Sequence, residues 1–63
     1  MSAYEIGAES ITVQFSTGAV YLYTYKSAGN GNIEKMKLLA VAGKGLNSFI
    51  MRNVRKSYES KLR

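Results

Sequence analysis

The feature that most constrains the fold is a change in hydrophobic period along the chain. From Ser10 to Phe15, apolar and polar residues alternate strictly, which is typical of a strand with one buried face. Residues 19–25, after a glycine-containing turn, are predicted to form the next strand, so residues 10–25 are predicted to form a β-hairpin. A short alternating segment at residues 4–6 predicts a strand before it. From residue 33 onward, apolar residues recur at helical spacing instead.

The turn inside this hairpin decides which face of the sheet the tyrosines occupy. A three-residue loop pairs Phe15 with Ala19. Both tyrosines then lie on the core face, with Val13 opposite Tyr21 and Ile11 opposite Tyr23. A two-residue loop would pair Phe15 with Val20 and move the tyrosines to the other face. We prefer the three-residue loop because Thr-Gly is a poor type I′ turn, since its first central residue also needs a positive φ.

The first predicted helix follows a loop. Lys26 to Asn32 is predicted to be that loop, and the helix then runs from Ile33 to Ala42. Asn30 or Asn32 can cap its start, and Gly43 is suited to end it. Its predicted buried stripe consists of Ile33, Met36, Leu39 and Ala40.

The second predicted helix runs from Leu46 to about Tyr58. One side of it is apolar and consists of Leu46, Phe49, Ile50, Val54 and Tyr58. Asn53 falls within this apolar sector, where a buried amide would need a hydrogen-bond partner in strand or loop backbone, and a ligand contact is the alternative. Residues 59–63 are expected to fray.

These elements predict an α+β fold with a three-stranded antiparallel β-meander followed by two helices packed on one face, in the order β-β-β-α-α. The helices must cover the sheet, because a lone hairpin cannot support itself. The chain has 63 residues and no internal repeat or linker, so a single domain over residues 1–63 is expected. Such a small domain should be marginally stable.

The composition argues against an enzyme and against a metal or cofactor site. The chain has no histidine and no cysteine, so the commonest general base and the usual metal ligands are missing. Its four acidic residues are scattered glutamates, which do not form the converging set of oxygens that a hard cation needs. We therefore expect no catalytic residues, no metal and no cofactor.

A cytoplasmic location is expected from the same composition. Small secreted domains usually need disulfides, and this chain has no cysteine. Its longest apolar run, Leu38 to Ala42, is far shorter than the ~20 residues that cross a bilayer, so no membrane partner is expected. Glu5 and Glu9 stand where a signal peptide would have a basic region and then an apolar block.

Positive charge is concentrated in the second half of the chain. Residues 35–63 carry a net charge of +7, whereas residues 1–34 carry −2, and this asymmetry suggests an anionic partner. Arg52, Arg55 and Lys56 are spaced to share one exposed patch of the second helix, which suits backbone phosphates. The alternative is the solvated outer face of an amphipathic helix.

The segment around Lys44 has only part of a phosphate-loop pattern. Leu38 stands where the first glycine of a P-loop belongs, and Gly45 stands where Ser or Thr should hold magnesium. A weaker hypothesis is that N–H groups at the start of the second helix, beside Lys44, receive one phosphate oxygen. We favour a helix–helix turn whose glycines supply unusual dihedral angles.

Tyr21, Tyr23 and Tyr25 alternate along the third predicted strand. Aromatic residues on a sheet can stack on the bases of single-stranded nucleic acid. Tyrosine is also a common strand residue that packs its ring in the core. Core packing is favoured for Tyr21 and Tyr23, because the preferred register puts them under the helices.

A longer pattern covers most of the chain: a strand ending in Phe-x-x-Gly, then Val-Tyr-x-Tyr, a helix, and a Lys-Gly link into Arg-Asn-Val-Arg-x-x-Tyr. The residues concerned are Phe15, Gly18, Val20, Tyr21, Tyr23, Lys44, Gly45, Arg52, Asn53, Val54, Arg55 and Tyr58. With this pattern the chain resembles the KTSC domain family, a module found at the C-terminus of some lysyl-tRNA synthetases and as a stand-alone small bacterial protein. The chain departs from the family pattern by lacking Val-Pro after the tyrosine strand and by extra length between Gly45 and Arg52. Through the synthetase context, the resemblance implies RNA binding, and it carries over no catalytic residues.

The charge, the tyrosines and the resemblance together predict a non-catalytic domain that binds RNA or single-stranded nucleic acid through a basic C-terminal helix. The predicted binding residues are Lys44, Arg52, Arg55 and Lys56 for phosphates, and Tyr21, Tyr23 and Tyr25 for bases. The alternative is a protein–protein interaction module or a homodimer. It would use the apolar residues expected at the surface, Val20, Leu22 and Leu38.

Overall fold

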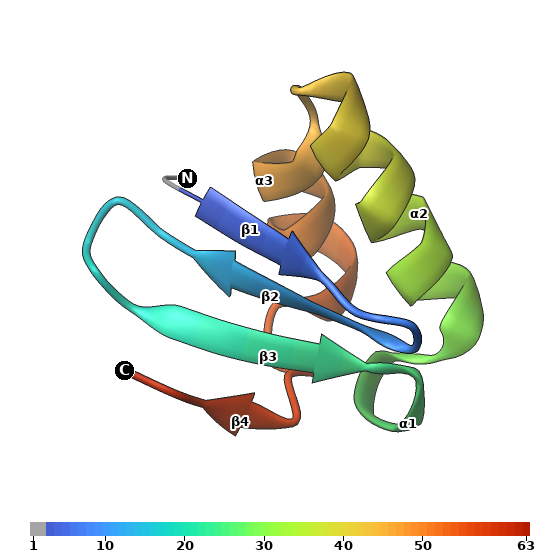
Figure 1. Ribbon diagram of the computed structural model, residues 1–63, viewed down its shortest axis with the longest axis horizontal. Helices are drawn as coiled ribbons and strands as arrows, with labels where there is room; N and C mark the ends of the chain where they lie inside the picture. The colour runs from blue at the N-terminus through green and yellow to red at the C-terminus, as the bar shows by residue number, and fades with distance from the viewer. Residues whose placement is uncertain (1–2) are drawn as a thin grey trace.

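The structure, a computed structural model, describes residues 3–63 as a four-stranded antiparallel sheet with helices on one face (Figure 1). The strands lie side by side in chain order: β1 (Ala3–Ile6), β2 (Ser10–Gln14), β3 (Val20–Thr24) and β4 (Ser60–Lys61). The helices are α1 (Tyr25–Ala28), α2 (Asn30–Ala42) and α3 (Leu46–Phe49), and α3 continues as a π-helix, η1 (Ile50–Val54). The α+β class is confirmed, whereas the layout of three strands followed by two helices is wrong, because a fourth strand follows the helices.

The β2–β3 turn has the predicted three-residue loop. The Phe15 amide donates to the Ala19 carbonyl at 2.9 Å, and the Gly18 amide donates to the Phe15 carbonyl at 2.9 Å. Gly18 has a φ of 94°, the left-handed conformation that this turn requires. Tyr21 and Tyr23 therefore have the core-side partners expected of them.

The segment predicted to be a loop, residues 26–32, is largely helical. A reciprocal capping box starts α1, in which the Thr24 hydroxyl accepts from the Ser27 amide at 3.1 Å and the Ser27 hydroxyl accepts from the Thr24 amide at 3.0 Å. Tyr25 is consequently the first residue of α1 and does not continue the third strand. Gly29, with a φ of 91°, separates α1 from α2.

Helix α2 begins three residues earlier than Ile33, and neither asparagine caps it. The N-cap is Gly29, and the Asn32 side chain instead donates to the Ala28 carbonyl at 2.7 Å. The end of the helix is as predicted, because Gly43 is left-handed and its amide donates to the carbonyls of the last turn. Of the predicted stripe, Ile33, Met36 and Ala40 are buried and Leu39 is half-buried.

The second helix was predicted to be an α-helix from Leu46 to about Tyr58. In the structure it ends at Val54, and its second part, η1, has the wider turn of a π-helix. Its buried residues, Leu46, Ile50 and Val54, are four apart. Over eight residues a regular α-helix, with 3.6 residues per turn, would rotate the last of them by about 80° from the first. The wider turn of η1 offsets this rotation and keeps all three side chains in the core.

The C-terminal segment does not fray but pairs with β3 as strand β4. The amides of Glu59 and Leu62 donate to the carbonyls of Leu22 and Val20 at 2.6 and 2.7 Å, and the Val20 amide donates to the Arg63 carbonyl at 3.0 Å. Val20 was expected at the surface and is only 6% exposed, because this segment runs beside it. Leu22 is half-buried for the same reason.

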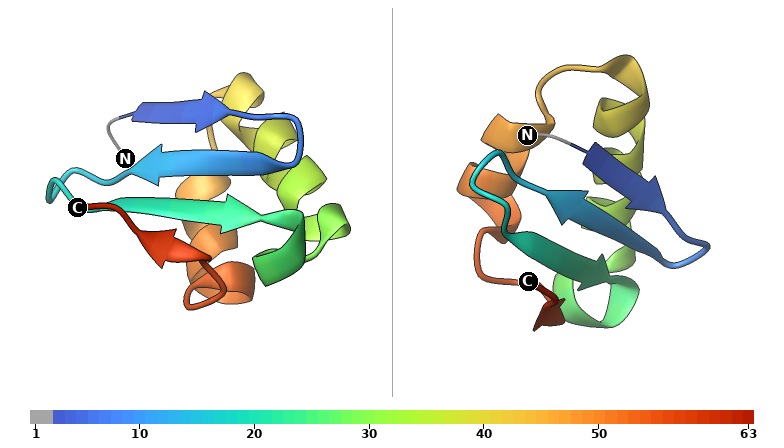
Figure 2. Two further views of the ribbon diagram at one scale, coloured as in Figure 1. Left: turned by 60° about the horizontal axis from the view of Figure 1, so that its bottom comes forward. Right: turned by 60° about the vertical axis from the view of Figure 1, so that its left-hand side comes forward.

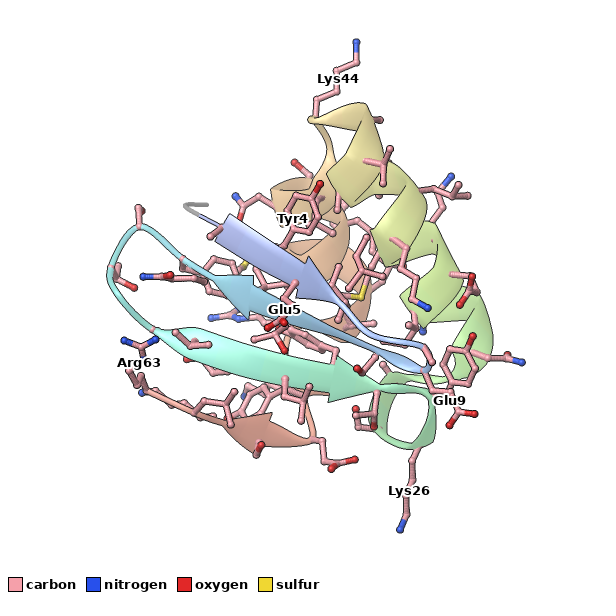
Figure 3. The ribbon with its side chains drawn as sticks, in the orientation of Figure 1. Tyr4, Glu5, Glu9, Lys26, Lys44 and Arg63 are labelled. Carbon is pink, nitrogen blue, oxygen red and sulfur yellow. The ribbon has the colours of Figure 1, made fainter. Side chains whose placement is uncertain are left out.

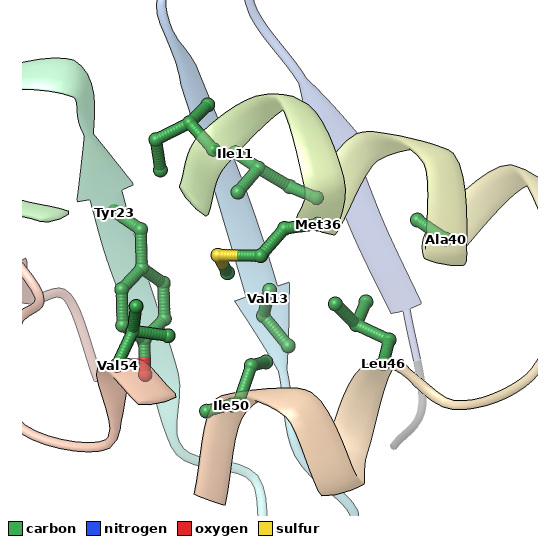
Figure 4. Packing of buried hydrophobic residues seen from close by; sticks show 9 residues of the cluster. Ile11, Val13, Tyr23, Met36, Ala40, Leu46, Ile50 and Val54 are labelled. Atoms are coloured by element: carbon green, nitrogen blue, oxygen red, sulfur yellow. The ribbon is translucent and has the colours of Figure 1, made fainter. Parts of the chain in front are cut away.

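The core lies between the sheet and the two long helical segments (Figures 2 and 4). Its buried members are Ile11, Val13, Tyr23, Ile33, Met36, Ala40, Leu46, Ile50 and Val54. The helices cross one face of the sheet, and no helix of residues 3–63 covers the other (Figure 1). On that outer face β2 carries the polar residues Ser10, Thr12 and Gln14, and β3 carries Thr24, Leu22 and Val20 opposite them.

Candidate nucleic-acid interface

An aromatic groove of about 450 Å³ lies between the β2–β3 loop and the end of η1, two segments that Figure 2 (right) shows beside each other. We use the name aromatic groove for this depression throughout. Its floor is made of Phe15, Tyr21, Tyr23 and Tyr58. One wall carries Ser16 and Thr17, and the other carries Met51, Arg55 and Lys56.

The floor of the aromatic groove is a cluster of rings in contact. The Tyr21 and Tyr58 centroids are 4.7 Å apart, and Phe15 meets Tyr21 edge-on at 5.6 Å. Tyr58 also meets Tyr23 edge-on, with centroids 6.3 Å apart. Such pairs favour offset and edge-on geometry, so the rings hold one another in fixed orientations. Tyr58 remains 37% exposed, which leaves part of its ring available to a ligand.

Tyr23 belongs to the core more than to the groove. Its side chain is 1% exposed, so its ring faces cannot stack on a base. Burial raises the pKa of Tyr23 to about 12, with smaller contributions from Tyr21 and Tyr58. Its contribution to the site is to support the Tyr58 ring.

The cations beside the aromatic groove have no carboxylate partner within residues 3–63. The single ion pair of the described chain joins Lys37 to Glu34 at 3.1 Å, on the α2 side of the molecule. Arg55 and Lys56 line the groove, and Arg52 is exposed on η1, three and four residues before them. The Lys61 ammonium lies 5.9 Å from the centroid of the Tyr21 ring. The charge of this cluster is therefore available to an external anion.

Lys44 does not join this cluster. It is exposed in the α2–α3 link and points away from the body of the molecule (Figure 3). The whole length of α3 and η1, roughly 12 Å of helix, separates it from Arg55. It borders a different depression, together with Tyr4 and Leu39. Of the four cations predicted from the sequence, the structure therefore brings Arg55 and Lys56 to the groove. Arg52 is exposed on η1 and does not line it.

Tyr25 is also remote from the aromatic groove. From the start of α1, its hydroxyl donates to the Glu34 carboxylate, which also accepts from Lys37. The Lys37 ammonium lies 5.6 Å from the Tyr25 ring centroid and donates to the Ala8 carbonyl at 2.9 Å. The hydrogen bond to Glu34 raises the pKa of Tyr25 and lowers that of Glu34. These contacts connect α1, α2 and the β1–β2 turn, which is a structural role.

Asn53 is exposed, and the prediction of a buried amide is wrong. Its side chain donates to the Phe49 carbonyl at 3.1 Å, four residues back along the helix. The wider turn of η1 directs Ile50 and Val54 inward and leaves Asn53 on the outside.

The binding residues predicted from the sequence did not include six residues of the site, which are Phe15, Ser16, Thr17, Met51, Tyr58 and Lys61. Phe15 and Tyr58 have the apolar periodicity of core residues, and Met51 carries no charge. Lys61 would continue the positive charge of the second predicted helix only if that helix extended to it. Only the return of the chain after η1 brings Tyr58 and Lys61 to β3. The signal that could have found Tyr58 was its spacing of three residues from Arg55, which puts two side chains on one face of a helix.

Within residues 3–63, no three acidic side chains come together in a way that could hold a metal ion. No helix in the same part of the chain is long and apolar enough to span a bilayer. Comparisons with protein-family models, with curated proteins and with solved structures find no match to this chain.

Proposed function

We propose that this chain is a non-catalytic domain that binds RNA or single-stranded nucleic acid through the cations around the aromatic groove. The observation that carries this proposal is that Arg55 and Lys56 border an aromatic floor without any carboxylate partner among the described residues. Unpaired guanidinium and ammonium groups favour phosphate oxygens, and exposed rings favour bases. Lys61 lies over the Tyr21 ring and adds a positive charge to the same site, and Arg52 is exposed on η1.

We also propose that the chain belongs to the KTSC family. The sequence pattern that carries this resemblance includes Phe15, Arg55 and Tyr58, all of which line the aromatic groove. A cytoplasmic site of action is part of the same proposal and rests on the absence of cysteine.

The test is fluorescence anisotropy with a labelled single-stranded RNA across a range of salt concentrations. If about three cations contact phosphates, each adds ~0.7 to the log–log salt slope, so a slope of roughly −2 is expected. Arg52→Glu combined with Arg55→Glu should weaken binding at least tenfold and make the slope shallower. A matched control is Lys26→Glu combined with Lys44→Glu, which changes the net charge equally at two exposed sites away from the groove (Figure 3).

Two results would contradict the proposal. One is the absence of binding at low salt. The other is an equal loss of affinity in the Arg52/Arg55 variant and in the Lys26/Lys44 variant, which would mean that only the overall charge matters.

Self-association is a second candidate function. Leu38 and Val41 are 68% and 72% exposed and lie three residues apart on α2, so their side chains are neighbours on the surface. Of the apolar residues expected to form such a surface, only Leu38 is exposed. Light scattering over a wide concentration range should detect a dimer that Leu38→Glu dissociates. A monomer at every concentration would rule this candidate out.

A further inference from the structure

We infer that the aromatic groove accepts one unpaired nucleotide of a single strand, with its phosphate at Arg55 and Lys56 and its base over the exposed part of Tyr58. This inference rests on the proposed function and specifies the ligand at the same site. It has three supports, which are the size of the groove, its uncovered apolar surface and the separation of its charged and hydroxyl-bearing walls.

The size of the groove limits what it can hold. A volume of about 450 Å³ is at the small end of the range that takes a single small ligand, about 300–1,000 Å³. A base within a duplex has both faces covered by its neighbours and cannot enter a depression on a protein surface without leaving the stack. A groove of this size therefore suits a single nucleotide whose base is already unstacked.

Uncovered apolar surface in the groove is placed for a base. Tyr58, on the floor, is 37% exposed, and Met51, on the helical wall, is 47% exposed. A base that touched both would contact an aromatic ring and a polarisable thioether, and both contacts are favourable for π systems. A surface that bound only duplex phosphates would need the cations but not this exposed ring and thioether.

The two walls of the groove have different chemistry. Arg55 and Lys56 lie on the helical wall and can donate to phosphate oxygens. Ser16 and Thr17 lie on the loop wall, and their hydroxyls can donate to or accept from a base edge or a ribose 2′-hydroxyl. A nucleotide placed across the groove satisfies both walls at once. The two cations face no carboxylate within residues 3–63, so the charge complementarity is with an anion outside the chain.

The experiment compares four probes by anisotropy or competition at one salt concentration: a labelled single-stranded RNA, the same strand annealed to its complement, an abasic strand of equal length, and a nucleoside 5′-monophosphate. The expected result is at least tenfold tighter binding of the single strand than of the duplex or the abasic strand. The monophosphate should compete weakly. Tighter binding of the monophosphate than of the strand would overturn the assignment to a strand and make a free nucleotide the ligand.

Variants then test the stacking surface separately from the charge. Met51→Ala and Tyr58→Leu should each weaken single-strand binding about fivefold or more and leave the salt slope unchanged. Tyr58→Phe keeps the ring and should bind like the parent chain. Leu38→Ala, at an exposed apolar site on α2, is the matched control for Met51→Ala. If Tyr58→Leu unfolds the domain, the comparison of Met51→Ala with Leu38→Ala still tests whether a base contacts the groove.

The failure of this inference is distinguishable from the failure of the proposed function. Equal binding of single strand, duplex and abasic strand, with no effect of Met51→Ala, would overturn the single-nucleotide site but leave a polyanion-binding surface. No binding of any nucleic acid probe at low salt would overturn both.

Discussion

Because of Tyr23, the free energy of unfolding should decrease at alkaline pH. Its side chain is 1% exposed, and burial raises its pKa from 10.0 to about 12. Between these two pH values the unfolded chain has lost the tyrosine proton and the folded chain has kept it. Stability is therefore fully present below about pH 10 and falls as the pH rises toward about 12. After an allowance for solvent screening at the hydroxyl, we expect a loss of about 1–2 kcal/mol.

Denaturant unfolding at about pH 8, 10 and 11.5 measures this loss. Tyr23→Phe should remove most of the dependence on pH, whereas Tyr21→Phe, at a half-buried position of the same strand, should keep it. An identical decline in the parent chain and in Tyr23→Phe would mean that another group titrates.

At the scale of elements, strand β4 has an effect larger than its two residues suggest. Its segment supplies backbone hydrogen bonds to Leu22 and Val20 and brings Lys61 to the Tyr21 ring. Removal of residues 59–63 should cost about 2–3 kcal/mol of unfolding free energy, because these hydrogen bonds are lost and Val20 is uncovered. It should also expose the edge of β3, which promotes association between chains.

Thermal unfolding of the truncated chain checks this expectation. The control is Leu62→Ala, which keeps every backbone hydrogen bond of the segment and alters a side chain that is half exposed. A melting temperature in the truncated chain equal to that of the control would show that β4 adds nothing to stability. The proposed RNA binding should fall in the truncated chain as well. The truncation removes Lys61, and it removes the segment that holds the chain after Tyr58 beside β3.

Over the whole molecule, local patterns predict the hairpin and the end of α2 well. The alternation around Ile11 and Val13 and the glycine after α2 specify the backbone without reference to distant residues. The π-helix was not predicted, because the buried face was assigned at 3.6 residues per turn, which holds only for a regular α-helix. The capping box of α1 lies within a stretch whose glycines and asparagines are typical of a loop.

The aromatic groove could be predicted only in part, because it is built from two stretches, residues 15–23 and 51–58, that are far apart in the sequence. The charge spacing of Arg52, Arg55 and Lys56 is local and was visible in the sequence. The proximity of Arg55 and Lys56 to Phe15 and Tyr58 depends on the hairpin turn and on the return of the chain to β3. Strand β4 has two residues, too few to show an alternating pattern in the sequence. The positions of Tyr58 and Lys61 beside β3 were therefore not predicted.

Because the hairpin loop, the end of η1 and the segment before β4 all border one depression, any occupant would tie the N-terminal and C-terminal halves together. A ligand that binds only the folded chain stabilises it against unfolding. At a concentration a hundred times its dissociation constant, it adds about 2.7 kcal/mol to the free energy of unfolding. In so small a domain this should raise the melting temperature by ten degrees or more, on the order of 4–8 °C per kcal/mol. A plate of candidate oligonucleotides and metabolites could thus be screened with nothing more than a melting curve.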